Sequence, residues 1–417
     1  MSIQSLWRAA RLVVSIVVFI LAGMQTAAAY KITEGEFAGT DLNFYGQINR
    51  MLRYGSDGDH SDFQQLDNGT NQTRVGIAAS TTSGYGPIQR WGANYELGIT
   101  SNLSTYVPLK SSGPYNVSQS PFQTRIAEVW GEGRWGKLSL GQGNGAARFA
   151  GRTDLSGTQM TNGNDFRGAS ATQFRDSSGI ARGDVDDVFH FYEGLRDDRV
   201  RYDLPTWQGL SASVSMGTDQ EREFGLTYGD TVGAHHNSFD ESSSYADSSW
   251  YHRWYDSKVA ASLGYSENID INSVFPNSTS SGYSILYRRQ LAASASILHP
   301  SGFNLTAAYG RQSPIGIPAF TTSTINHNNN SAWYLKGGYR FGSHAFSIDY
   351  GRSEGVRDPQ FTDEKVNGMH WGAGYNWEMG AYDLYGGIRQ FKMERHVAGA
   401  SDPHAIDTVT AGVRMRF

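Results

Sequence analysis

Thr408-Val409-Thr410-Ala411-Gly412-Val413-Arg414-Met415-Arg416-Phe417, the last ten residues of the chain, decide the fold class. Every second residue is apolar, and the residues between them are Thr, Gly or Arg. A period of two indicates a β-strand, because successive side chains of a strand point to opposite faces. A helix would mix the two sets around its circumference. Segments of about ten residues with this alternation are typical of strands in transmembrane β-barrels.

The same alternation recurs upstream, and its apolar face often begins or ends on Tyr, Trp or Phe. Clear examples are Leu210–Met216, Val259–Tyr265, Phe303–Gly310, Trp333–Phe341 and Met369–Trp377. Aromatic strand ends match the aromatic girdles that such barrels carry at the two membrane interfaces. A soluble sandwich with amphipathic strands is the alternative, but its core positions need no aromatic residues at strand ends. The pattern therefore favours an all-β, antiparallel transmembrane barrel.

The composition agrees with many strands and tight turns. The chain has 417 residues, among them 49 Gly, 23 Tyr, 20 Phe and 10 Trp, but only 11 Pro and no Cys. Its mean hydropathy of −0.47 suits a barrel that is polar inside and apolar outside. Without cysteine there are no disulfides, so a closed hydrogen-bonded barrel must hold the exported chain together.

The N-terminus predicts export. Arg8 and Arg11 precede an apolar run from Leu12 to Gly23, and Ala27-Ala28-Ala29 supplies small residues before a cut at Tyr30. This is the anatomy of a secretory signal peptide, and the run is too short for a membrane span. We therefore expect residues 1–29 to be a signal peptide and residues 30–417 the barrel. Removing two arginines from a formal charge of −5 leaves −7, which argues against nucleic acid and hints at cation preference.

Sixteen strands are predicted, an even number as bacterial barrels require. Short turns are expected to alternate with long polar loops, among them 55–71 and 217–247. The eighth strand is expected at 248–256. Residues Phe224–Gly229, inside the expected loop 217–247, could add a pair of strands and give eighteen strands in all. Glu128 and Arg289 fall on the apparent outer face, which a subunit interface, a bulge or a register error would explain.

One connection, residues 144–197, is far longer than the others. It is rich in Gly, Ser and Thr and carries many Arg and Asp residues. A long loop in a compact fold is usually functional or disordered. We therefore place the functional constellation there.

Four short motifs carry a resemblance to a known family. They are Phe44-Tyr45-Gly46, Leu138-Ser139-Leu140-Gly141-Gln142, Val200-Arg201-Tyr202-Asp203 and the terminal Phe417. In these motifs and in layout the chain resembles the general diffusion porins of Gram-negative outer membranes. The resemblance implies a homotrimer of sixteen-stranded barrels whose third loop, here 144–197, folds into the lumen and narrows the pore. It also implies contact with outer-membrane lipid and lipopolysaccharide, and recognition of Phe417 by the barrel assembly machinery.

The family further implies that acidic loop side chains face basic side chains on the barrel wall. By position, the basic wall residues would be Arg74, Arg125, Arg199 and Arg201. The acidic loop residues would be Asp154 and Asp165, or alternatively Asp184, Asp186 and Asp187. Alternation with apolar neighbours independently points these arginines inward. Gln47 stands where many family members have Lys or Arg, so the basic cluster on the wall is expected to differ from that of the family. The Pro-Glu-Phe-Gly-Gly loop motif of the family is absent, so the path of the loop is also expected to differ.

No pattern indicates an enzyme or a cofactor. The chain has no Gly-x-Ser-x-Gly, His-Glu-x-x-His or P-loop motif. Loop carboxylates could bind Ca²⁺, but no loop has a diagnostic spacing.

Three functions stay open from the sequence. The first is a passive channel for small hydrophilic solutes and ions. The second is a selective channel, either for sugars along Tyr45, Tyr334 and Tyr385, or for anions along a basic ladder. The ladder would comprise Arg74, Arg125, Arg253, Lys336, Arg340, Arg389, Arg414 and Arg416. The third is an outer-membrane hydrolase, which would need a non-local site.

Overall fold

The fold is taken from a computed structural model. It describes residues 30–32, 40–81, 85–109, 120–189, 194, 196–218, 221–229, 253–254, 257–270, 284–318, 325–326, 330–357, 365–395 and 401–417. No helix in these ranges is long and apolar enough to cross a membrane.

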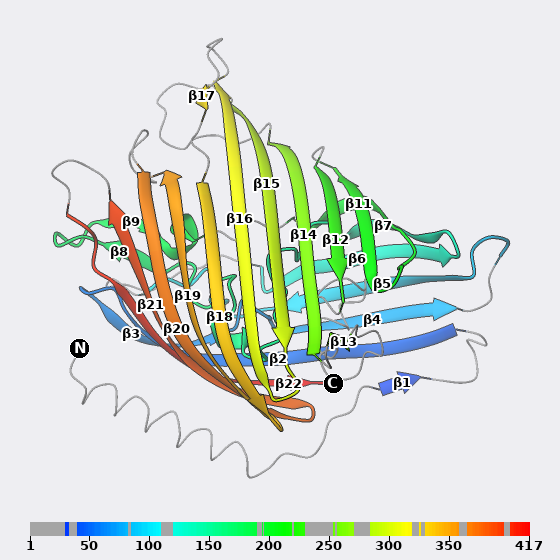
Figure 1. The fold of residues 1–417 in the computed structure, drawn as a ribbon, viewed down its shortest axis with the longest axis horizontal. Helices are drawn as coiled ribbons and strands as arrows, with labels where there is room; N and C mark the ends of the chain where they lie inside the picture. Colours follow the sequence, from blue (N-terminus) through cyan, green and yellow to red (C-terminus); the bar gives the residue numbers. More distant parts are fainter. Residues whose placement is uncertain are drawn as a thin grey trace.

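The described residues form a closed, sixteen-stranded antiparallel barrel (Figure 1). Its strands are β2 (Thr40–Ser56), β3 (Ser61–Asp67) continued by β4 (Arg74–Thr81), β5 (Arg90–Ile99), β6 (Phe122–Gly133), β7 (Gly136–Asn144), β10 (Arg196–Asp203), β11 (Leu210–Gly217), β12 (Arg222–Tyr228), β14 (Ser257–Asp270), β15 (Ser284–Leu298), β16 (Phe303–Pro318), β18 (Asn330–Phe341), β19 (His344–Arg357), β20 (Lys365–Met379), β21 (Tyr382–Arg395) and β22 (Ile406–Arg416). Short elements are β1 (Tyr30–Ile32), β8 (Gln173–Arg175), β9 (Ala181–Asp184), β13 (Arg253–Trp254), β17 (Ile325–Asn326), α2 (Gln159–Asn162) and α3 (Val185–Val188).

The C-terminal strand closes the barrel. β22 pairs with β21 on one side and with β2 on the other. The N–H of Phe417 donates to the carbonyl of Gly46 (3.0 Å), and the N–H of Gly46 donates back to the carbonyl of Phe417 (2.8 Å). The Phe417 ring stacks on Phe44, with 6.1 Å between centroids. Phe417 thus fixes the register where the last strand meets the first, here called the seam. With this pairing, the described barrel strands leave no open sheet edge.

Side chains are distributed inside out relative to a soluble protein. On β10, Val200 is 47% exposed while Arg199 and Arg201 are each 4% exposed. The same contrast separates Leu140, exposed, from Ser139, buried. Apolar side chains therefore face the lipid, and polar side chains face a filled interior, as the alternation predicted.

The eighth strand is not where the sequence placed it. β12, at Arg222–Tyr228, pairs with both β11 and β14 and takes the eighth position. The predicted strand at 248–256 lies mostly outside the described residues, and β13 there pairs only with the start of β14. The eighteen-strand alternative is wrong, because one strand lies between β11 and β14, not three.

Two predicted loops change accordingly. Residues 61–67 of the expected loop 55–71 form β3, which pairs with the outer half of β2. Within the expected loop 217–247, only 218–221 joins β11 to β12, on the rim of long loops. The long connection, 229–256, starts and ends on the rim of short turns. The expected alternation of short and long connections fails at this pair, since β12 replaced the predicted strand.

A β-bulge explains the anomalous Glu128. The register between β5 and β6 shifts, so that Glu96 pairs with Ile126 but Leu97 pairs with Thr124. Arg125 is therefore the extra residue, and both Arg125 and Ile126 are buried. One inserted residue reverses the parity of everything after it. Glu128 consequently faces the lumen and not the lipid. Arg289, in contrast, is exposed, and its side chain pairs with Glu267 on the neighbouring strand β14 (3.4 Å).

The long connection between β7 and β10 comprises residues 145–195 and is here called the inner loop. Its described residues, 145–189 and 194, lie inside the barrel. Serine hydroxyl groups of the barrel wall accept hydrogen bonds from backbone N–H groups of the inner loop. Thr153 donates to Ser294 Oγ and Leu155 to Ser296 Oγ, both at 2.9 Å. Gly264 allows close approach, because a Cβ there would collide with Ala147 and Ala150. Buried N–H groups need such partners, so a Ser-rich wall suits a docked loop.

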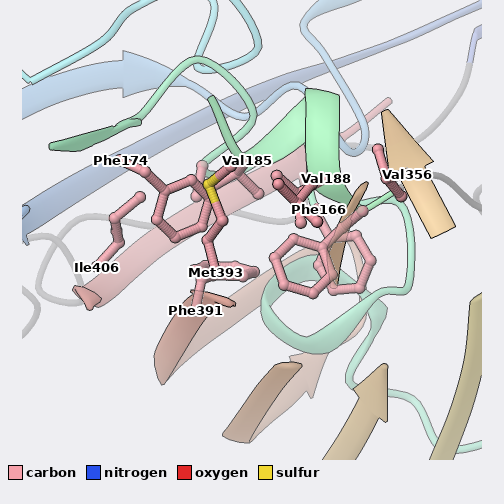
Figure 2. Close-up of a cluster of buried hydrophobic side chains, with 11 residues drawn as sticks. Phe166, Phe174, Val185, Val188, Val356, Phe391, Met393 and Ile406 are labelled. Carbon is pink, nitrogen blue, oxygen red and sulfur yellow. The ribbon is translucent and has the colours of Figure 1, made fainter. Parts of the chain in front are cut away.

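The second half of the inner loop docks through an apolar cluster (Figure 2). Phe166, Phe174, Val185, Val188 and Phe189 come from the loop. They pack on side chains from β19 to β22, namely Val356, Val366, Phe391, Met393 and Ile406. Apolar residues on the lumen face of these strands are unusual for a water-filled barrel. Here they bind the loop to the wall by hydrophobic burial.

Candidate functional site: a basic constriction

A cavity lies between the inner loop and the wall near β4 and β6. We call it the constriction cavity. None of the residues that line it is acidic, and it includes Gln72, Phe149 and Met160. Six arginines line it: Arg74, Arg125, Arg148, Arg152, Arg167 and Arg196.

On the wall side, one buried carboxylate holds two guanidinium groups. Glu96, on β5, is 0% exposed. It contacts Arg74 Nε at 3.2 Å and accepts a hydrogen bond from Arg125 Nε at 2.5 Å. Arg74 also donates to the side chain of Asn71, at 2.7 Å. Because β4, β5 and the β6 bulge supply these groups, the barrel scaffold fixes the two arginines.

On the loop side, the carboxylate of Asp165 holds two arginines, as Glu96 does on the wall side. Its carboxylate is 2.8 Å from Arg152 and 4.0 Å from Arg167. Burial alone would raise the pKa of Asp165, but the two guanidinium groups outweigh it and lower the pKa below its usual value. Asp165 therefore stays ionised and orients both arginines. On each side of the cavity, two cations share one carboxylate.

Successive turns at the start of the inner loop present further arginines. The N–H of Arg148 donates to Gly145 and that of Arg152 to Phe149. Both guanidinium groups lie 5.4 Å from the Phe149 ring centroid, within the range of a cation–π interaction. The aromatic ring thus contacts two of the cations that line the cavity.

The other two predicted wall residues, Arg199 and Arg201, do not line the constriction cavity. Arg199 pairs with Glu128 at 2.5 Å and also donates to backbone carbonyls of Gly141 and Asn144. Arg201 pairs with Asp203 and donates to the Gly145 carbonyl at 2.6 Å. Arg201 lines a second cavity, between the start of the inner loop and the wall. Both brace the base of the inner loop.

The predicted loop acids do not themselves line the constriction cavity. Asp154 is turned to the far wall, where its carboxylate accepts from Lys336 Nζ at 2.5 Å. Asp184 and Asp187 cap α3 through reciprocal backbone hydrogen bonds of 3.0 Å. Burial and the neighbouring Asp187 raise the pKa of Asp184 to about 7, so it is not a fixed charge at neutral pH. Asp186 is exposed on the same short helix.

Sequence reasoning chose acidic residues of the inner loop, whereas the charged loop residues that line the cavity are Arg148, Arg152 and Arg167. Arg148 and Arg152 are four residues apart on either side of Phe149, which was a weak signal for a shared face. Nothing local to the sequence shows that Asp154 pairs with Lys336, or that Asp165 is shared by Arg152 and Arg167. Within the described residues, no group of three or more His, Asp or Glu side chains could hold a metal ion.

Comparison with known proteins identifies the family. A model described as "Gram-negative porin" matches residues 13–396. No curated protein matches the sequence.

Solved structures share the fold at low identity. The anion-selective porin of Comamonas acidovorans aligns with a TM-score of 0.54 at 14% identity, covering 91% of this chain and all of that one. Outer-membrane OmpT of Vibrio cholerae and Salmonella typhi OmpF, the latter in complex with daunomycin, each give 0.54 at 12% identity over 93% of this chain and all of theirs. From the barrel, the docked inner loop and the family match over most of its length, we conclude that this chain belongs to the Gram-negative porin family and is a non-enzymatic diffusion channel of the outer membrane.

Proposed function

We propose that this porin passes small hydrophilic solutes with a preference for anions. The observation that supports this is the lining of the constriction cavity, which has six arginines and no acidic residue. Rings of positive charge beside a narrow aqueous path lower the free energy of an anion there and raise that of a cation. The net charge of −5 does not oppose this, because a distant charge is screened within about 10 Å.

In this proposal, Arg74 and Arg125 form the wall side of the selectivity region, and Arg148, Arg152 and Arg167 form its loop side. Arg199 and Arg201 act indirectly by bracing the loop base. Asp154 and Asp165 position the loop and its arginines, and Asp184, Asp186 and Asp187 belong to its α3 region. The Comamonas porin is described as anion-selective, and its likeness here is one of fold.

Sugar selectivity has less support. The hydroxyl of Tyr334 donates to the Asn162 carbonyl of the inner loop, and Tyr385 donates to Asn49. Neither tyrosine lines the constriction cavity. An aromatic track for sugars needs exposed ring faces along the path, and these rings are buried.

The reversal potential in a KCl gradient tests the anion preference. We expect the permeability of chloride to exceed that of potassium. A unit charge near 4 Å contributes on the order of 1 kcal/mol in water, so R152Q/R167Q should lower the chloride-to-potassium ratio roughly tenfold. R289Q is a matched control, because its side chain is 53% exposed and pairs with Glu267. A wild-type reversal potential of the cation-selective sign would refute the preference.

We further propose that the mature protein is a homotrimer that begins at Tyr30. The exposed outer residues Phe44, Ile48 and Phe63 near the seam are the proposed subunit contact. Lipopolysaccharide would contact the remaining outer wall, and Phe417 would be read by the barrel assembly machinery. We expect native mass spectrometry of the detergent-solubilised protein to give three copies of a chain lacking residues 1–29. A single copy, or an intact N-terminus, would contradict the respective part.

A further inference from the structure

The amide of Gln72 is a buried donor at the edge of the constriction cavity. Gln72 lines that cavity and is 6% exposed. Its Nε2 atom has no hydrogen-bond partner among the residues that the structure describes. A buried polar group without a partner costs free energy, so its presence calls for an explanation such as a ligand.

Gln47 holds the backbone from which the Gln72 side chain extends. The side chain of Gln47, 1% exposed, donates to the backbone carbonyls of Asn71 and Gln72, both at 2.8 Å. Gly98 leaves room for Gln72 Nε2, and a Cβ at that position would also lie 3.3 Å from Arg125 Cδ. The amide therefore lies next to Arg125, on the wall of the cavity.

We propose that the constriction cavity contains a saturable binding site for small oxyanions, of which inorganic phosphate is the type, with Gln72 as a neutral donor beside the guanidinium groups of Arg74, Arg125 and Arg152. This rests on the proposed anion preference and goes beyond it, since a selective field alone requires no binding site. Deleting the Gln72 donor leaves the charge of the cavity unchanged, so the two ideas can be separated.

The donor chemistry favours oxyanions over chloride. A guanidinium group offers planar, paired N–H donors that match two oxygens of a phosphate or carboxylate. Arginines from the wall and from the loop line the same cavity, so donors from both can converge on one anion. A tetrahedral oxyanion has enough acceptor oxygens for these donors and for an amide N–H. Chloride accepts from the same groups without the bidentate geometry.

The test is a titration of channel conductance. The full-length mature protein is reconstituted in planar bilayers in KCl, and phosphate is added at constant ionic strength and pH. We expect the chloride current to fall along a saturating curve, with a half-maximal effect at low millimolar phosphate, since a bound oxyanion occupies the narrow path. Sulfate should compete, because it shares the tetrahedral arrangement of oxygens.

Q72L removes the donor and keeps the size of the side chain. Loss of one hydrogen bond to a charged group should raise the half-maximal phosphate concentration about tenfold. Because Q72L does not change the charge of the cavity, such a rise reports the missing donor and not a weaker electrostatic field. Q312L is the matched control, because Gln312 is also buried, at 9% exposed, but does not line this cavity. Heat-modifiable migration on gels shows that each variant has folded.

Each outcome bears on one of the two proposals. An anion-selective reversal potential with a strictly linear response to phosphate overturns the binding site and leaves the anion preference standing. A saturating response that Q72L does not weaken removes Gln72 from the site. A cation-selective reversal potential overturns the anion preference itself, whatever phosphate does. Saturation weakened by Q72L but not by Q312L supports the site as proposed.

Discussion

K336M is expected to release the first half of the inner loop from the barrel wall. The side chain of Lys336 is 0% exposed, and its Nζ lies 2.5 Å from Asp154 and 3.2 Å from Ser156. Methionine would leave the carboxylate of Asp154 buried without its cation. Removing one partner of a buried pair costs about 3–5 kcal/mol.

Limited digestion with trypsin checks this, because the released segment contains Arg148 and Arg152. We expect K336M to be cut there much faster than the wild type, and single-channel currents to become noisier as the loop moves. The double variant K336M/D154L should recover most of the resistance, since replacing both partners with apolar groups is often close to neutral. Wild-type resistance in the single variant would show that the ion pair does not hold the loop.

F166A is expected to loosen the second half of the inner loop. Phe166 is 2% exposed and lies between loop and wall, with ring centroids 5.5 Å from Phe189, 5.7 Å from Phe391 and 4.6 Å from His370. Truncating a buried Phe to Ala typically costs about 3–5 kcal/mol. The barrel itself should stay intact, because its strands are held by their own hydrogen-bond ladders.

Hydrogen–deuterium exchange measures the effect segment by segment. Amides of residues 166–189 should exchange much faster in F166A, while those of β19 to β22 keep their protection. F303A is a suitable control, since Phe303 is 66% exposed on the outer face and should leave the loop unchanged. Equal protection of the loop in F166A and the wild type would show that the apolar cluster contributes little to docking.

The barrel was predictable because its signal is local. Strand β22 alternates residue by residue, and the same period marks β16, β18 and β20. Lipid on one side and a polar interior on the other impose that period wherever a strand crosses the membrane. The fold class and the number of strands could therefore be deduced without the structure.

The same reasoning failed where parity or pairing depends on distant partners. From the sequence alone, the β12 region is only a possible additional strand, because its seven residues carry a weak alternating pattern. Its pairing with β11 and β14 is what makes it a barrel strand. The bulge at Arg125 is visible only against Glu96 and Leu97 of β5. An inserted residue leaves no mark on composition, but it turned Glu128 toward the lumen.

The sequence by itself determined that this chain is a barrel of alternating strands with charged groups on one long loop. The tertiary structure decided which charged side chains line the constriction cavity. Asp154 is drawn to Lys336 and Asp165 is shared by Arg152 and Arg167, so arginines are left to line the cavity. The physical reason is that alternation depends on neighbours in the chain, whereas ion pairing depends on groups that fold together from far apart. Asp154 and Lys336, for example, are 182 positions apart in the sequence.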